Sequence, residues 1–533
     1  MIVSILIHTA DGGHLALEPR LGESLARTIF LSRLWHDVPL CSGLGKCGLC
    51  RVRFVSAPPD STGEELKKLG RDALNQGWRL ACLHPSEPCE VEIPAPVRSA
   101  RAVRALASSG GDAAPAGGGF VLAGGDFVLA VDLGTTSIHW TVLADGQPVA
   151  TGQELNPQTG LGSEIMSRLA VAATAEGRFV LRALILDRLA EIAAMAARNM
   201  GGACTGLAVS GNPAMTYILL GMQPDGLAAA PYALTYAGGD ERRLGAGLPP
   251  AHIPPLLAPF VGADISAGLV AIEYGSAPHY PFLLADLGTN GEFVLALSPD
   301  RRLVASVPMG PALEGVGLSF GRTAGPSTIT GFRLTPQGLA PVRFEGDSAD
   351  GPPTAMTGTG YISLTAILLR HGVLDDAGHF ATGTTPLAAR LAARLTTLAD
   401  EPALALDHGL FLPASDVEEI LKVKAAFNLA MSALLAEAGL SPSRLAAVHV
   451  AGALGEHVSL DDLETLGFLP PGLGARTVKA GNTSLKGTEK LVTDPGARAF
   501  ARTLPDTITA LDLTADPSFG HRFMQRMRFT HVD

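Results

Sequence analysis

The sequence predicts a multidomain protein in which a small α+β domain at the N-terminus precedes a larger, duplicated α/β region. Three observations support this prediction. The chain has 533 residues, which corresponds to about three to four domain lengths. Five of its six cysteines fall within the first 89 residues. In the later part, a strand followed by Asp-Leu-Gly-Thr occurs twice, 154 residues apart.

Composition and charge exclude two broad classes of protein. Hydrophobic residues make up 47 % of the chain and charged residues 17 %, so a core can form and disorder is not the main state. Residues 1–98 carry 11 Lys+Arg and 11 Asp+Glu, so the net charge of −11 belongs entirely to the remainder. This acidic remainder argues against nucleic acid as a partner, because such binding needs a basic face.

No segment is expected to enter a membrane or to direct export. The N-terminus lacks the basic stretch and cleavage site of a signal peptide. Residues 244–263 carry no Asp, Glu, Lys or Arg, but their five prolines would break a spanning helix, so we expect a loop packed on a core. We therefore expect a cytoplasmic protein, and a reducing compartment favours metal binding over disulfides for the clustered cysteines.

Residues 1–98 are predicted to form the small domain. Strands over 2–7 and 14–18 form a hairpin, and a helix follows over 22–34. A strand over 50–55, a charged helix near 63–76 and a closing strand over 91–93 complete the domain. Residues 99–126 are rich in Ala, Gly and Ser, which predicts a flexible linker whose first part forms a short helix.

The clustered cysteines have nearly the spacing of a plant-type [2Fe–2S] ligand set, with one extra residue in the first gap. The predicted ligands are Cys41, Cys47, Cys50 and, after 31 intervening residues, Cys82. Three glycines within the loop, Gly43, Gly45 and Gly48, let the backbone curl and direct N–H groups at the sulfurs. A zinc site and purely structural cysteines are the alternatives, although zinc usually uses two short Cys-x2-4-Cys pairs. Cys89 and Cys204 lie outside the pattern and are interpreted as buried structural thiols.

The segment CSGLGKCGLC…LACLHP resembles a ferredoxin domain with adrenodoxin-like spacing. The resemblance covers about residues 1–95 and implies an N-terminal β-grasp ferredoxin fold of the α+β class.

Each Asp-Leu-Gly-Thr turn follows an apolar strand and is suited to binding phosphate. The aspartate can hold Mg²⁺ or its water shell, the glycine admits close backbone approach, and hydroxyls and amides donate to phosphate oxygens. A plain β-turn is the alternative for one copy, but the repeat favours a paired site. No G-x4-G-K-S/T is present and no G-x-G-x-x-G follows an early strand, which disfavours a P-loop and a dinucleotide fold. The predicted phosphate-binding residues, which the resemblance described below extends to ATP, are Asp132, Gly134, Thr135, Thr136, Asp286, Gly288, Thr289, Asn290 and Gly291.

A third segment lies near the C-terminus, where a strand over 447–450 precedes Gly452 and Gly455. Such a small, glycine-containing strand end suits the flat approach of an adenosine. Before it, residues 416–438 are predicted as a helix with a Ser415–Glu418 capping box and Gly439 at its C′ position. The three segments together resemble the superfamily of acetate kinase, sugar kinases, heat-shock chaperone ATPases and actin. The resemblance implies a duplicated α/β actin-like ATPase fold, with a middle domain over 127–280 and a C-terminal domain over 281–533.

The whole arrangement resembles the reductive activators of corrinoid-dependent enzymes. Further stretches carry this resemblance: Asn156-Pro157-Gln158, Gly211-Asn212-Pro213-Ala214-Met215, Gly262-Ala263-Asp264, Gly310-Pro311-Ala312-Leu313-Glu314-Gly315 and Lys422-x-Lys424-Ala425-Ala426. It implies ATP-dependent transfer of an electron from the [2Fe–2S] cluster to a cobalt(II) corrinoid, restoring cobalt(I). It also implies ATP and Mg²⁺ as further cofactors, a corrinoid protein and an external electron donor as partners, and a homodimer. The chain departs from the family at Gly358-Thr359-Gly360-Tyr361 and near 340–355.

Catalytic residues and two alternative functions stay open at this point. Glu314 and Glu456 can position water for hydrolysis, although a structural role is the simpler interpretation of each. One alternative is a small-molecule kinase with a fused redox-sensing ferredoxin domain. The other is an electron carrier that binds nucleotide without turnover.

Overall fold

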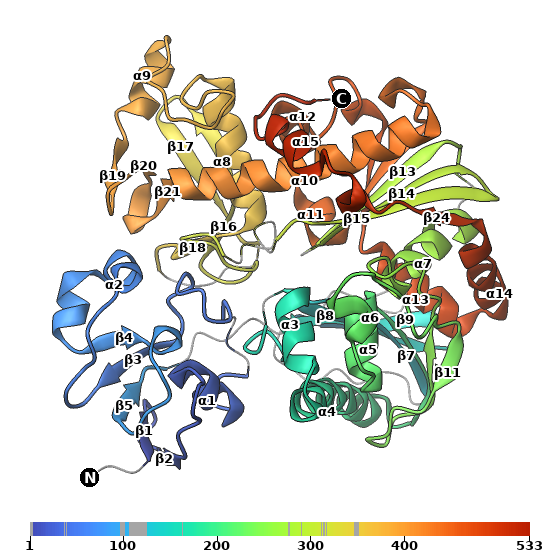
Figure 1. Ribbon diagram of the computed structural model, residues 1–533, viewed down its shortest axis with the longest axis horizontal. Helices are drawn as coiled ribbons and strands as arrows, with labels where there is room; N and C mark the ends of the chain where they lie inside the picture. Colours follow the sequence, from blue (N-terminus) through green and yellow to red (C-terminus); the bar gives the residue numbers. More distant parts are fainter. Residues whose placement is uncertain are drawn as a thin grey trace. The chain divides into compact units, whose positions relative to one another are not determined.

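Figure 1 shows the computed structural model of the chain, which divides into two compact, discontinuous units. Unit 1 contains Met1–Ala100, Pro157–Ser163 and Glu314–Ile420, and unit 2 contains Arg101–Asn156, Glu164–Leu313 and Leu421–Asp533. The structure describes residues 4–36, 38, 40–95, 102–105, 125–162, 164–275, 278–288, 290–310, 312, 315, 317–345 and 351–532.

The N-terminal part of unit 1 is a five-stranded mixed sheet with the strand order β2-β1-β5-β3-β4. Its β1–β2 hairpin is antiparallel, whereas β1 and β5 are parallel. The predicted hairpin, helices and strands are confirmed, and Ile29 and Phe30 of α1 are fully buried. The elements are β1 (Ile5–Thr9), β2 (His14–Leu17), α1 (Leu25–Leu31), β3 (Arg51–Phe54), α2 (Gly63–Asn75), β4 (Trp78–Leu80) and β5 (Glu90–Ile93).

The remainder of unit 1 contains two small three-stranded sheets, β17-β16-β18 and β19-β20-β21, with α8 packed against β16. Its elements are β16 (Thr328–Thr335), β17 (Gly338–Arg343), β18 (Ala355–Met356), α8 (Gly358–Arg370), α9 (Pro386–Ala392), β19 (Leu395–Leu398), β20 (Glu401–Ala405) and β21 (Phe411–Pro413). The tetrapeptide at 358–361, where the sequence departs from its family resemblance, forms the first turn of α8, and Tyr361 there is fully buried.

Unit 2 contains the duplication that the two repeats predict. One sheet has the order β11-β12-β10-β7-β8-β9-β6 and the other β23-β22-β13-β14-β15-β24. In both, three antiparallel strands continue into two parallel ones, so β12-β10-β7-β8-β9 corresponds to β23-β22-β13-β14-β15. The strands are β6 (Ala102–Ala105), β7 (Phe127–Leu133), β8 (Ser137–Ala144), β9 (Gln147–Leu155), β10 (Cys204–Ser210), β11 (Asp240–Arg242), β12 (Ala251–Ile253), β13 (Phe282–Leu287), β14 (Asn290–Ser298), β15 (Arg301–Pro308), β22 (Ala447–Ala451), β23 (Thr477–Gly481) and β24 (Ile508–Ala510).

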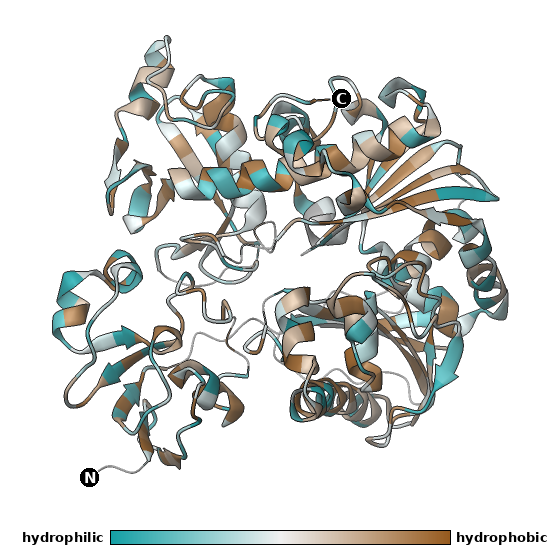
Figure 2. Ribbon diagram, viewed as in Figure 1, coloured by the Kyte–Doolittle hydropathy of each residue, from teal (hydrophilic) through white to brown (hydrophobic). Residues whose placement is uncertain are grey.

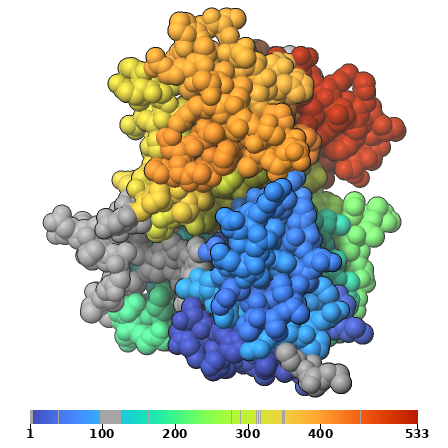
Figure 3. Space-filling view, turned by 90° about the vertical axis from the view of Figure 1, so that its left-hand side faces the viewer, coloured from blue at the N-terminus to red at the C-terminus, as the bar shows by residue number. Residues whose placement is uncertain are grey.

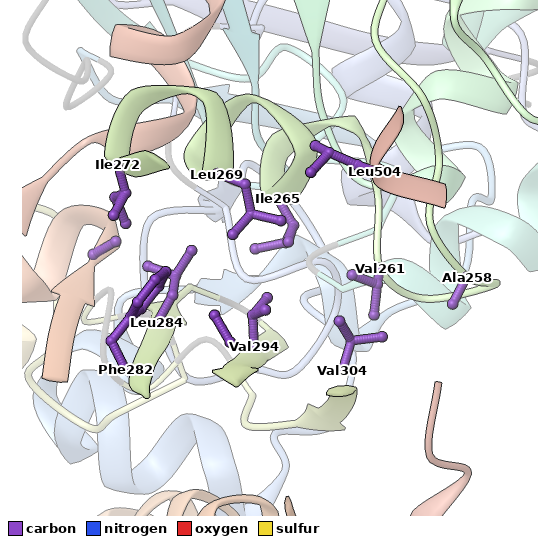
Figure 4. Close-up of a cluster of buried hydrophobic side chains, with 12 residues drawn as sticks. Ala258, Val261, Ile265, Leu269, Ile272, Phe282, Leu284, Val294, Val304 and Leu504 are labelled. Atoms are coloured by element: carbon purple, nitrogen blue, oxygen red, sulfur yellow. The ribbon is translucent and has the colours of Figure 1, made fainter. Parts of the chain in front are cut away.

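The two repeats exchange helices. Helix α7 (Ala263–Leu269), from the first repeat, packs Ile265 and Leu269 onto Phe282 and Leu284 of the second sheet (Figure 4). Helix α13 (Thr483–Thr493), from the second repeat, packs on β7 and β10 of the first sheet. The hydrophobic residues that drive this packing run along β13 and β14 (Figure 2). The helices themselves touch at Gly487, where an added Cβ would lie 1.7 Å from the Ala267 carbonyl oxygen.

Other helices of unit 2 surround these layers. They are α3 (Ile165–Ala172), α4 (Ala175–Met200), α5 (Pro213–Leu220), α6 (Asp225–Ala228), α11 (Gly452–His457), α12 (Leu460–Thr465), α14 (Pro495–Thr503) and α15 (Phe519–Gln525). None of the helices in the described part of the chain combines the length and the apolar character that crossing a membrane requires. Residues 244–263 contain the short strand β12 and the first residue of α7 and otherwise form loops, and Leu244, Leu256 and Val261 are buried, as predicted.

Two local predictions need correction. Ala102–Ala105 form strand β6, paired antiparallel with β9, so the short helix predicted there is wrong. The remaining predicted linker residues, apart from Gly125 and Asp126, lie outside the described residues. Helix α10 (Ala414–Ala438) already includes Ser415, so the predicted capping box is wrong. The Ser415 amide and hydroxyl instead donate to the Glu401 carboxylate, at 2.9 and 3.2 Å, because β20 brings that acceptor alongside.

The C-terminal end and the apolar stripe of α10 are confirmed. Gly439 has φ +65° and its amide donates to the Ala436 carbonyl at 3.0 Å, which is the left-handed ending predicted for that glycine. Val417, Phe427 and Leu434 of the predicted stripe are fully buried.

Candidate functional site

The four predicted ligand cysteines of unit 1 line one cavity of about 160 Å³. Cys41, Cys47 and Cys50 come from the loop between α1 and β3, and Cys82 comes from the turn after β4. Cys41 and Cys50 are 1 and 2 % exposed. Gly43, Gly45 and Gly48 all have positive φ angles, between 69 and 97°, so the predicted glycine-dependent curl of the loop is confirmed.

Hydrogen bonds connect the four sulfurs in sequence. Thiol contacts join Cys41 to Cys47, Cys47 to Cys50, and Cys50 to Cys82. The backbone amides of Cys47 and Leu49 donate to Cys41 Sγ and Cys47 Sγ, each at 3.4 Å. Hydrogen bonds from its neighbours lower the pKa of the Cys47 thiol, whereas the same bonds raise the pKa values of the Cys41 and Cys50 thiols.

The cavity collects four thiol donors, the number that either a [2Fe–2S] cluster or a zinc ion would use, so the cluster stays a prediction. Thiols this close compete for ionisation, so all four become thiolates only when positive charge lies among them. Among the described residues, no group of three or more His, Cys, Asp or Glu surrounds a common metal position. A [2Fe–2S] cluster needs four thiolates shared between two irons, with N–H groups directed at sulfur, and the cavity provides these donors.

The other two cysteines have the character of structural thiols. Burial raises the pKa of Cys89 and of Cys204 to about 11, so both remain protonated at neutral pH. Neither lines the cysteine cavity. Both are only partly buried, so the full burial expected from sequence is not found, and their structural role stays an interpretation.

The first predicted phosphate loop, at the end of β7 in unit 2, is fixed by four side-chain hydrogen bonds. Asp132 accepts from Asn482 Nδ2 at 2.7 Å and from Ser484 Oγ at 2.8 Å, so both carboxylate oxygens are held. Asn156 Nδ2 donates to the Gly134 carbonyl at 2.8 Å, and Asn212 Nδ2 donates to Thr135 Oγ1 at 3.0 Å. Thr135 and Thr136 are each 5 % exposed.

The second predicted loop, after β13, meets the start of α11. Gly452 has φ +83°, and an added Cβ would lie 2.7 Å from both Asp286 Oδ1 and the Leu287 carbonyl oxygen. Only glycine therefore fits beside this aspartate. Gly455 is similarly restricted, because its Cβ would lie 2.6 Å from the Val450 carbonyl oxygen. Both glycines thus allow α11 to pack closely, and their contact with adenosine stays a prediction.

Contacts are described for two further residues of the second loop, Gly288 and Gly291. The Gly288 amide donates to the Asn290 carbonyl at 3.0 Å. At Gly291, an added Cβ would lie 2.2 Å from Met309 Sδ. Thr289 and Glu314 lie outside the described residues, and of Glu456 only the backbone, in α11, is described.

Two acidic residues that the predicted site did not include lie beside the two aspartates. Glu292, the residue after Gly291, is 6 % exposed, and burial together with Asp264 and Asp286 raises its pKa well above the usual range. Burial and the charge of Asp132 raise the pKa of Asp264 to about 7. The four carboxyl groups therefore influence one another at the ends of the two repeats, and a bound cation would relieve their repulsion.

The sequence contained a signal for only some of these additional residues. Glu292 directly follows a predicted phosphate loop, and Asp264 and Asn212 belong to stretches that carry the family resemblance. Asn482 and Ser484 had no such signal, because they reach Asp132 only through the helix exchange, from 350 and 352 residues away.

Comparisons with known proteins cover both units. The family model described as the RACo middle region matches residues 127–276, and the model of the C-terminal domain of RACo, the ASKHA domain, matches 281–533. The chain is 26 % identical over 424 residues to the corrinoid activation enzyme RamQ of Eubacterium limosum, covering 75 % of this chain and 70 % of that protein. It is 30 % identical over 260 residues to a Co(II) methylated amine-specific corrinoid protein reductase of Methanosarcina barkeri, which covers 45 % of this chain and 44 % of that protein.

A solved structure shares the fold over nearly the whole length. A reductive activator for corrinoid, iron–sulfur protein matches with a TM-score of 0.67 at 21 % identity, covering 99 % of each chain.

Proposed function

Because this chain belongs to the RACo family, whose middle region and C-terminal ASKHA domain it carries, we propose that it is an ATP-dependent reductive activator of a corrinoid protein. It would deliver one low-potential electron to a cobalt(II) corrinoid and restore cobalt(I). The observation that carries this proposal is the convergence of four cysteines on one cavity, in the same chain as two facing phosphate-type loops. The names of two relatives, a corrinoid activation enzyme and a corrinoid protein reductase, support the choice of partner.

The electron-carrying part is residues 1–98, which we propose to be a β-grasp ferredoxin domain. Its sheet order β2-β1-β5-β3-β4 and the cysteine cavity support this assignment. Cys41, Cys47, Cys50 and Cys82 would hold the cluster, and the amides of Cys47 and Leu49 would stabilise charge on the ligand sulfurs. When bound, a plant-type [2Fe–2S] cluster supplies a one-electron carrier with a potential near about −400 mV.

The ATP-binding part comprises the proposed middle domain, 127–280, and C-terminal domain, 281–533, after a linker over 99–126. Asn482 and Ser484 hold both oxygens of Asp132, so this carboxylate cannot rotate away from Mg²⁺ or its water shell. Gly452 leaves room for Asp286 on the opposite side. Glu314 and Glu456 stay our proposed residues for positioning the attacking water.

ATP is needed on energetic grounds. Cobalt(I) is a strong reductant, so the donor needs a very low potential. Each ~59 mV by which the donor potential lies above that of the cobalt(II)/cobalt(I) couple lowers the equilibrium constant of the one-electron transfer tenfold, a cost of ~1.4 kcal/mol. Nucleotide binding and hydrolysis at the facing loops would offset this shortfall by changing how the chain contacts the corrinoid protein. An external electron donor would then reload the N-terminal domain.

The test uses the full chain, reconstituted with iron and sulfide and mixed with a corrinoid protein in its cobalt(II) state. We expect cobalt(I) absorbance to grow only when ATP and Mg²⁺ are both present. Cys47→Ser should abolish electron delivery but leave ATP affinity unchanged. Asp286→Ala should weaken ATP binding, and with it cobalt(I) formation, while keeping the visible absorption of the cluster. Equal cobalt(I) formation without nucleotide would refute the proposal, as would an anaerobic preparation with no visible absorption.

A further inference from the structure

The cysteine loop of unit 1 is bounded on one side by a lysine from α2. An added Cβ at Gly48, between two predicted ligand cysteines, would lie 2.7 Å from Lys68 Cε. From there the side chain continues to residues 319–320 of the same unit, where its ammonium group donates to the Ser319 carbonyl and lies 5.2 Å from the centroid of the Phe320 ring. Lys68 therefore contacts the cysteine loop with its stem and a distant segment with its charge.

The segment that receives Lys68 is held rigid. Both oxygens of Asp416, a residue only 2 % exposed, accept from the Ser319 amide at 3.0 Å, and Oδ1 also accepts from the Ser319 hydroxyl at 2.9 Å. The Tyr361 hydroxyl accepts from the Phe320 amide and donates to Asp416, each at 3.0 Å. The Ser319 carbonyl is thus presented in a fixed position, which lowers the entropy cost of the lysine contact.

A second segment bounds the cysteine loop independently. The hydroxyl of Ser42, next to Cys41, donates to the Thr159 carbonyl, and Gly160 and Leu161 line the cysteine cavity itself. Gly160 packs so closely on Phe30 that an added Cβ would lie 2.2 Å from its ring. Residues 159–161 belong to the Asn-Pro-Gln-Thr-Gly-Leu stretch, most of which is buried.

We propose that unit 1 has a docked resting conformation in which residues 159–161 and 319–320 of the chain itself cover the cysteine loop. Lys68 and Ser42 are the positioning residues that hold it. In Figure 3 the blue N-terminal surface adjoins the yellow-to-orange surface of the Glu314–Ile420 segment of the same unit. Electron transfer slows steeply with distance, so a protein partner needs this face and the covering segments must leave first. The inference rests on the proposed function and adds a release step to it.

The experiment compares how fast the reduced, reconstituted full chain passes one electron to a small and to a protein-sized acceptor. Ferricyanide is the small acceptor and cytochrome c the large one, and each takes one electron as its iron(III) becomes iron(II). Losing the charged hydrogen bond of Lys68 should raise the rate to cytochrome c about tenfold in Lys68→Ala, which corresponds to about 1.4 kcal/mol. The rate to ferricyanide should stay within about twofold, because only a large acceptor is kept away.

Lys67→Ala is the matched control, because it removes the same charge one residue away. Lys67 is exposed, and its ammonium group pairs with Glu64 within α2 at 3.7 Å. Ser42→Ala tests the second segment and should also raise the cytochrome c rate selectively. A change in cluster potential would move the rates to both acceptors together, and Lys68→Arg should restore the slow rate.

The possible results separate this inference from the proposed function. Equal ratios of the two rates in the wild type, Lys68→Ala and Ser42→Ala would overturn the docked conformation while leaving electron delivery intact. A wild-type preparation without visible cluster absorption would overturn the proposed function and this inference with it. If Lys68→Ala loses its cluster, the ratio measured with Ser42→Ala decides.

Discussion

Replacing Gly452 with alanine tests whether the second phosphate loop binds nucleotide through Asp286. Two separate effects are expected from the structure. The residue has φ +83°, and forcing a non-glycine residue into the left-handed region costs about 1–2 kcal/mol. The new Cβ would also lie 2.7 Å from Asp286 Oδ1 and from the Leu287 carbonyl oxygen, so the aspartate must move.

The size of the binding effect follows from what Asp286 would lose. A contact made by a charged group contributes about 1.5–3 kcal/mol, so displacement should weaken Mg·ATP binding roughly 10- to 100-fold. Isothermal titration calorimetry measures this affinity, and urea unfolding measures the accompanying loss of stability.

Gly472→Ala separates the two effects. Gly472 has φ +80°, close to that of Gly452, but an added Cβ there has no heavy atom within 4 Å. Both variants should lose about 1–2 kcal/mol of unfolding free energy to backbone strain, and only Gly452→Ala should lose ATP affinity. Wild-type affinity in Gly452→Ala would refute the reasoning that places Asp286 in the nucleotide site.

Three further predictions concern other parts of the molecule. Asn482→Ala removes the N-cap of α13 and a hydrogen-bond donor to Asp132, so it should cost about 1 kcal/mol of stability and also weaken ATP binding. The control Ser459→Ala removes the N-cap of α12, so it should cost about the same stability and leave ATP affinity unchanged. Burial and two arginines lower the pKa of His252 to about 4, so the folded state resists a proton that the unfolded chain accepts near pH 6.5. The free energy of unfolding should therefore fall by roughly 3 kcal/mol as pH drops from about 6.5 to 4, and His252→Leu should remove this contribution. Urea unfolding at several pH values measures both proteins, and an equal pH dependence in the wild type and the variant would contradict the prediction. Cys89→Ser and Cys204→Ser should keep the visible absorption that Cys47→Ser loses, and loss in either would show a ligand outside the cavity.

Features set by short stretches of chain were predictable. The cysteine loop is one example, because three of its four cysteines and all three glycines lie within residues 41–50, and that spacing already restricts the backbone. The two phosphate-type turns are another, since each strand and turn are contiguous and the repeat made the pair recognisable. Even so, the predicted start of α10 was wrong. The Ser415 amide donates to Glu401 on strand β20, and not to Glu418 of the helix itself as the predicted capping box required.

By itself, the sequence determined which residues have the chemistry: thiols at ligand spacing, aspartates at strand ends and glycines where the backbone must turn. Their surroundings were decided only by the tertiary structure. Asn482 and Ser484 reach Asp132 because the repeats exchange helices, and Lys68 reaches Ser319 across 251 residues. The physical reason is that spacing along the chain encodes local geometry, whereas contacts between distant segments depend on the packing of whole layers, which no short pattern specifies.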